Sequence, residues 1–187
     1  MIDDYNWLSE AYLAGREHVY RQASAYLGRS PKRILDIGAG YARVSELFQI
    51  NHGSELWLLD GDFNTTIDKT RKGKYGDVED FKYYRTQQDL EQHWTSQGMR
   101  YTFVNGNDPQ IDPDVKFDLV TSWLSCGYHY PISVYADLIR KHTDENSVVI
   151  MDFRRKTIAE QQKDFTVVSR LDGDHISKYY TLHIKLN

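Results

Sequence analysis

Short apolar runs alternate along the chain with segments in which apolar residues recur at helical spacing. Near the N-terminus the apolar positions are separated by four or seven residues, at Leu8, Tyr12, Val19, Ala23 and Leu27. This spacing predicts an amphipathic helix within residues 1–30, and Gly28 is a suitable end for it ahead of Pro31. Three more helices are predicted for residues 41–50, 84–98 and 131–142, the last of which starts with a proline.

Seven apolar runs predict β-strands. They are RILDIG (33–38), ELWLLD (55–60), RYTFVNG (100–106), FDLVTSWLS (117–125), SVVIMDF (147–153), FTVVSRL (165–171) and YYTLHIKL (179–186). The early runs are almost entirely apolar, which is typical of parallel strands that are covered on both faces. The last two alternate apolar and polar positions and follow each other closely, so they predict an antiparallel hairpin.

Helices and strands alternate through the first five strands, and this order predicts an α/β fold. We expect a Rossmann-like, doubly wound sheet of about seven strands, with helices on both faces and the antiparallel hairpin at the C-terminus. Residues 1–187 show no linker or internal repeat, so we expect a single domain. Residues 61–83 lose the apolar pattern and are predicted to form a long loop or a lid over a site.

Composition disfavours several kinds of partner and cellular location for this protein. The formal charge is −4 and basic residues are dispersed, which disfavours nucleic acid as a partner. The single cysteine, Cys126, cannot form an internal disulfide, and a small buried apolar role is expected for it. No signal peptide, membrane-spanning run or zinc-like Cys/His cluster is present. We therefore expect a cytoplasmic protein that does not contact a membrane; its oligomeric state is left open.

Two glycines follow the first predicted strand, in LDIGAGYAR. Glycine at this position lets the backbone approach a ligand at the carboxyl end of a strand. A dinucleotide site needs the pattern GxGxxG, but its third position here is Arg43, which opposes that ligand.

The stretch resembles instead the first motif of class I S-adenosylmethionine-dependent methyltransferases, an acidic residue followed by GxGxG. The motif positions are Asp36, Gly38, Ala39, Gly40 and Ala42, with alanine in place of the last glycine. The resemblance implies S-adenosyl-L-methionine as cofactor and Asp60, before Gly61 at the end of the second strand, as the acceptor of both ribose hydroxyls. It also implies adenine contacts at Asn107 and Asp108. Asp36 has two open interpretations, ligand contact or capping of the turn.

A second segment, SWLSCGYHYP, resembles a subgroup of methyltransferase-like proteins that have a Gly-aromatic-His-Tyr-Pro turn after the fourth strand. In this fold that turn faces the methyl group, and it includes the predicted cofactor contact Ser122 and the predicted substrate contacts Trp123, Tyr128 and Tyr130. His129 is predicted either to act as general base or only to shape the turn. Asp152, at the end of the fifth strand, is predicted to be a pocket residue or a helix-start partner.

These patterns predict a methyltransferase that acts on a small-molecule acceptor, with oxygen favoured. No motif for amino-methylation of adenine or for cytosine ring methylation is present, and no acid follows the fourth strand as a metal ligand, so a metal-independent enzyme is expected. Two alternatives remain open at this point. One is a cofactor-binding regulatory protein of the same fold without catalysis, and the other is a protein or nucleic-acid methyltransferase.

Overall fold

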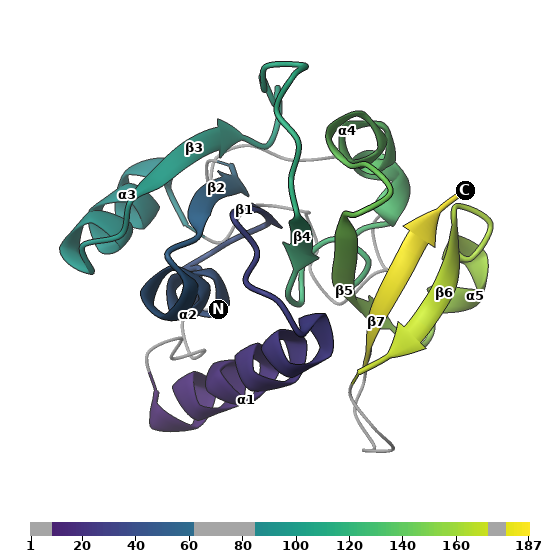
Figure 1. Cartoon of the computed structure of the whole chain (residues 1–187), viewed down its shortest axis with the longest axis horizontal. Helices are drawn as coiled ribbons and strands as arrows, with labels where there is room; N and C mark the ends of the chain where they lie inside the picture. The colour runs from purple at the N-terminus through teal and green to yellow at the C-terminus, as the bar shows by residue number, and fades with distance from the viewer. Residues whose placement is uncertain (1–8, 62–84, 172–178) are drawn as a thin grey trace.

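The computed structural model describes residues 9–61, 85–171 and 179–187 (Figure 1). Its helices are α1 (Glu10–Leu27), α2 (Arg43–His52), α3 (Gln87–Ser96), the 3-10 helix η2 (Ile132–Val134), α4 (Ala136–His142) and α5 (Ile158–Gln161). Its strands are β1 (Arg33–Ile37), β2 (Glu55–Asp60), β3 (Tyr101–Asn105), β4 (Leu119–Ser122), β5 (Val148–Arg154), β6 (Phe165–Arg170) and β7 (Tyr179–Leu186).

The seven strands form one sheet in the order β3-β2-β1-β4-β5-β7-β6. Strands β1 to β5 pair in parallel, whereas β7 pairs antiparallel with both β5 and β6. The predicted α/β sheet with its C-terminal hairpin is therefore confirmed. The chain runs outward from β1 to β3 and then returns to β4 on the other side of β1. This reversal places a topological switch point between the carboxyl ends of β1 and β4, where open α/β sheets bind ligands.

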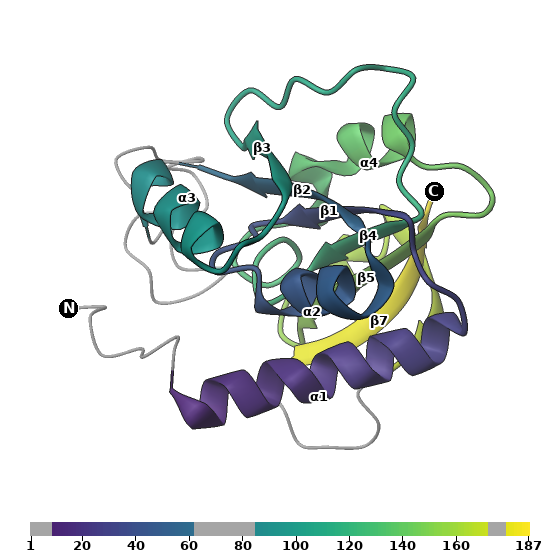
Figure 2. The same cartoon turned by 60° about the vertical axis from the view of Figure 1, so that its left-hand side comes forward.

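Two apolar layers cover the sheet. On one face, α1, α2 and α3 pack over alternate strand residues, with Phe48 and Trp94 fully buried there. On the other face, η2 and α4 pack through Ile132 and Ile139. Figure 2 shows α1 and α2 lying on the same side of the sheet. Because both faces are covered, the strands carry nearly continuous apolar runs, as parallel strands need.

The helix boundaries follow local signals. Ser9 caps α1 by accepting a hydrogen bond from Tyr12 N, and Gly28 ends it with φ 60°, as predicted. The predicted helix 131–142 is instead divided, because η2 precedes α4. The short helix α5 was not predicted. Apart from Gly61, the predicted loop 61–83 lies outside the described residues, and no described helix is long and apolar enough to cross a membrane.

Candidate functional site

The glycine turn joins β1 to α2 through three left-handed residues. Gly38, Gly40 and Ala42 have φ values of 70°, 52° and 53°. The amides of Gly38 and Ala39 both donate to Leu59 O, at 2.7 and 3.1 Å, which fixes the turn against the end of β2. Left-handed backbone is costly for most residues and cheap for glycine, so the two glycines meet a conformational requirement of the turn.

The two glycines have different surroundings. A Cβ on Gly38 would lie 1.8 Å from Ser125 Oγ, so the turn after β4 fills that space. Among the described residues, a Cβ on Gly40 would meet no atom within 4 Å. The backbone at Gly40 therefore borders open space, and this is the place where a ligand can approach the turn.

Asp60 lies directly beside this opening. Its Oδ2 accepts the amide of Gly40 at 2.7 Å and its Oδ1 accepts the amide of Gly61 at 2.8 Å. Burial raises the pKa of Asp60 to about 6, although the two amide hydrogen bonds oppose that rise. A carboxylate has about four acceptor sites, so two remain after these amides, enough for a vicinal diol.

Asp36 lies beneath the turn rather than on its surface. It is 1% exposed and accepts hydrogen bonds from Ser45 Oγ at 2.6 Å and Thr121 Oγ1 at 3.1 Å. Burial raises the pKa of Asp36 to about 6. The negative charge of Asp60 also raises this pKa, whereas the positive charge of Arg16 lowers it. Asp36 thus joins β1, β4 and α2, and its described contacts are structural ones. Of the two interpretations, the geometry favours the structural one.

Helix α3 contacts the glycine turn and fixes it. The sequence did not predict this contact. Trp94 Nε1 donates to Gly40 O at 3.0 Å, and the ring of His93 stacks on Tyr41 at 4.2 Å. Trp94 is fully buried, so its indole supports the turn without facing a ligand. The sequence predicted a helix over residues 84–98, but nothing local indicated what it packs against.

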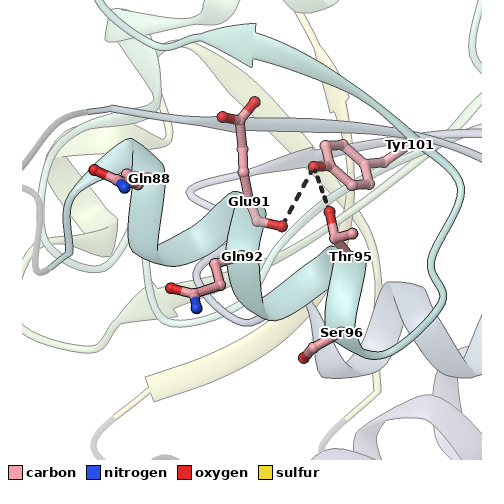
Figure 3. A pocket seen from close by; sticks show the side chains of 6 residues that line it. All are labelled: Gln88, Glu91, Gln92, Thr95, Ser96 and Tyr101. Carbon is pink, nitrogen blue, oxygen red and sulfur yellow. Dashed lines mark hydrogen bonds between the residues drawn. The ribbon is translucent and has the colours of Figure 1, made fainter.

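A shallow polar hollow lies on the opposite face of α3 (Figure 3). Its lining residues are Gln88, Glu91, Gln92, Thr95, Ser96 and Tyr101. These positions are turned away from Leu90 and Trp94 on the helix, and the Tyr101 hydroxyl bonds back to the backbone of Glu91. The hollow is therefore a feature of the outer surface, separate from the glycine turn.

The turn after β4 is fixed by two side chains that were predicted to lie at the ligand site. Ser122 is fully buried; its Oγ donates to Ile37 O at 2.7 Å and accepts from Cys126 N at 2.8 Å. Asp152 is also fully buried and accepts from Leu124 N at 3.0 Å and Thr181 Oγ1 at 2.6 Å. Both side chains therefore act inside the fold in this structure. The residue that donates to Asp152, Leu124, has left-handed backbone with φ 54°, which is unusual for a residue other than glycine.

Tyr130 brings the β4 turn against the glycine turn. It is 4% exposed, and its hydroxyl lies 3.0 Å from Ser125 Oγ, the atom that fills the space beside Gly38. Gln161 supports the same turn from α5, since it accepts from Ile132 N and donates to Gly127 O, both at 3.0 Å. Ser125 and Gln161 were not predicted from the sequence.

His129 and Tyr128 form the more exposed part of this turn. The His129 amide donates to Ser125 O at 2.8 Å, and burial together with the charge of Arg154 lowers the His129 pKa to about 4. The Arg154 guanidinium lies 4.3 Å from the centre of the Tyr128 ring and donates from Nε to Tyr128 O. The aromatic face of Tyr128 therefore already stacks on a cation of the protein, which reduces its availability for a substrate.

The remaining predicted residues lie at the same edge of the sheet. Asn107 and Asp108 are exposed directly after β3, and Gly106 N donates to Asp60 O at 2.7 Å, which fixes this loop beside the end of β2. Trp123 follows β4 and packs on the layer of α1 and α2. Within the residues described, no group of three or more His, Cys, Asp or Glu side chains is arranged to hold a metal ion.

Comparison with known proteins identifies the architecture. No family model matches the chain, and no curated protein matches it by sequence. Among solved structures, PH0226 protein from Pyrococcus horikoshii OT3 is 13% identical, with a TM-score of 0.63 over 97% of this chain and 93% of that one. The ribosomal protein L11 methylase from Lactobacillus delbrueckii subsp. bulgaricus is 14% identical, with a TM-score of 0.56 over 92% and 81%.

The T. thermophilus 16S rRNA methyltransferase RsmC, solved in complex with AdoMet and guanosine, is 12% identical. Its TM-score is 0.62 over 99% of this chain and 45% of that one. The chain has the fold of the class I methyltransferases. At these identities the likeness concerns the fold, so the chemistry must be argued from the site itself.

The open side of the turn has both space and hydrogen-bond acceptors for a ligand. Among the described residues, Gly40 leaves room for a ligand against the backbone, and Asp60 offers acceptor sites beside that room. Bulky Arg43 replaces the third glycine of the dinucleotide pattern, and its guanidinium binds Glu46 on α2 at 2.6 Å. The geometry at Gly40 and Asp60 therefore suits a ligand that carries a vicinal diol.

Proposed function

We propose that the chain is an S-adenosylmethionine-dependent methyltransferase that methylates an oxygen of a small molecule without a metal ion. The observation that carries the proposal is the pairing of Asp60 with the Gly40 amide at the open side of the glycine turn. The pairing places a carboxylate for the ribose hydroxyls next to backbone that a ligand can approach. Solved structures of the same fold include one in complex with AdoMet, which supports the choice of cofactor.

The bound cofactor would supply an electrophilic methyl group on its sulfonium. The chain's own residues then have two tasks, which are to hold the reactants in line and to accept a proton from the acceptor. In this proposal Asp60 holds the ribose, Ala39 and Gly61 contribute backbone contacts, and the loop of Asn107 and Asp108 borders the adenine. Trp123, Tyr128 and Tyr130 bound the acceptor.

His129 is the proposed general base. Its lowered pKa, about 4, keeps the imidazole neutral at physiological pH, the form that can accept a proton. The same low pKa makes it a weak base, so it suits an acceptor whose hydroxyl is already acidic, such as a phenol.

A second candidate is a protein that binds the cofactor without catalysis. It is favoured by Ser122, Tyr130 and Asp152, whose polar groups all bond within the fold. A nucleic-acid acceptor, as in RsmC, is disfavoured by the net charge of −4.

The test is transfer of a labelled methyl group from S-adenosylmethionine to a panel of hydroxylated metabolites, with EDTA present. Transfer to one of them supports the proposal. Cofactor binding without transfer to small molecules, proteins or RNA favours the second candidate, and loss of transfer in EDTA that magnesium restores contradicts the metal-independent form.

A further inference from the structure

Helix α1 carries a buried cation that has no counter-ion among the described residues. Arg16 is 7% exposed and shares the inner face of α1 with Val19 and Ala23. Its Nε is buried and has no hydrogen-bond partner, and the guanidinium makes no ion pair within the part of the chain that the structure describes. Its described contact is with the ring of Tyr12, at 5.3 Å. An arginine stays charged when it is buried, so an unpaired one is costly unless a ligand completes it.

This cation lies at the glycine turn. The contacts between α1 and α2 follow the same order along both helices. Glu17 pairs with Arg43 at 3.5 Å, and seven residues later Ser24 bonds His52, at the end of α2, at 3.3 Å. The helices therefore run parallel, and the part of α1 that contains Arg16 and Glu17 lies beside the start of α2, directly after the turn. The charge of Arg16 also lowers the pKa of Asp36 beneath the turn, but the two do not form an ion pair.

A second donor without an acceptor lies on the same side of the sheet. Trp123 Nε1 is buried and has no hydrogen-bond partner in residues 9–61, 85–171 and 179–187, and its ring packs on the layer formed by α1 and α2. Trp123 comes two residues after Thr121, whose hydroxyl reaches Asp36 on that face. The carboxyl end of β4 and the start of α1 therefore each present a buried N–H where an acceptor is needed.

We propose that Arg16, assisted by Trp123 Nε1, binds the carboxylate of the amino-acid part of S-adenosylmethionine. This rests on the proposed function. The carboxylate is the only anionic group of that cofactor, and a guanidinium binds a carboxylate through two parallel hydrogen bonds. With the ribose at Asp60, the amino-acid end of the cofactor extends from the turn toward β4 and α1, where these donors lie. Arg16 is then a cofactor-binding residue that the glycine motif does not include.

The experiment compares two ligands that differ only in this group, S-adenosylmethionine and its decarboxylated form. Calorimetry gives the affinity of each for the parent chain, for Arg16→Met and for the control Arg21→Met. Arg21 lies on the same helix, but its side chain is 74% exposed and pairs with Glu17. We expect the parent and R21M to prefer S-adenosylmethionine by about 10-fold or more, and R16M to lose the preference while it still binds the decarboxylated ligand.

The outcomes separate the two proposals. If the parent binds neither ligand, the proposed function fails and the role of Arg16 fails with it. If the parent binds both equally, or if R16M keeps the preference of the parent, the role of Arg16 is wrong while the proposed function stands. If R16M weakens both ligands by the same factor, Arg16 supports the fold and does not contact the carboxylate.

Discussion

The carboxylate of Asp60 accepts the amide of Gly40 at 2.7 Å, across the gap between the end of β2 and the turn after β1. This bond fixes the relative position of the two elements that the proposed cofactor must contact together. It also explains why a strand-end acid and a glycine 20 residues apart act as one unit.

Replacement of Asp60 by asparagine should weaken cofactor binding. An amide side chain offers one acceptor oxygen, so it cannot serve the Gly40 and Gly61 amides and both ribose hydroxyls. We expect a loss of about 1.5–3 kcal/mol in the free energy of binding, measured by calorimetry with S-adenosylhomocysteine. Unchanged affinity in D60N would show that Asp60 has only a structural role.

Alanine at the two glycines should have separable effects. In G38A the new Cβ would collide with Ser125 Oγ, so we expect a lowered free energy of unfolding, partly restored by Ser125→Gly. In G40A the Cβ meets no atom of the described residues, so added backbone strain lowers the free energy of unfolding by only about 1–2 kcal/mol, while cofactor binding is strongly weakened. Thermal unfolding and calorimetry distinguish the two, and a G40A variant that binds normally would place the ligand elsewhere.

Burial of Asp36 should make stability depend on pH. Its pKa is raised from 3.8 to about 6, so between these values the folded state binds more protons than the unfolded state. The contribution of Asp36 to stability is therefore lost as the pH rises through this window. We expect the free energy of unfolding of the parent, relative to Asp36→Asn, to fall by about 3 kcal/mol between about pH 3 and about pH 7. Denaturant titrations at several pH values measure it; a constant difference contradicts the buried ionisation.

His129→Asn should leave cofactor affinity unchanged and lower turnover by about 100-fold or more, the usual range of general-base assistance. Because the His129 pKa is lowered to about 4, a plot of parental turnover against pH should show no inflection near 6.5, the ordinary pKa of histidine. Steady-state kinetics with the acceptor found by screening measures both. Parental turnover in the asparagine variant would leave His129 with a role in shaping the turn only.

Much of the fold could be predicted because its signals are local. The early strands are nearly continuous apolar runs, the last two alternate apolar and polar positions, and Gly28 ends α1 within the same segment that forms it. The glycine turn and Asp60 were found for the same reason, since the turn directly follows β1 and Asp60 is the last residue of β2. The division of η2 from α4 was missed because Pro131 marks a helix start without indicating which kind of helix begins there.

The interior of the site depends on contacts between distant segments, which spacing does not reveal. Ser122 ends β4 as predicted, but β5 continues past Asp152 to Arg154, and both side chains bond groups inside the fold. Trp94 and Gly40 are 54 residues apart, and Arg16 belongs to a helix whose docking on α2 fixes its position. That Asp152 and Arg16 are buried follows only from the way these elements pack together.

Cofactor binding is tested most directly by calorimetric titration of the parent chain with S-adenosylhomocysteine and, separately, with NAD. We expect one saturable site per chain for S-adenosylhomocysteine, lost in a folded Gly40→Val variant, and no binding of NAD. The absence of binding of S-adenosylhomocysteine to the parent, or saturable binding of NAD instead, would contradict this expectation.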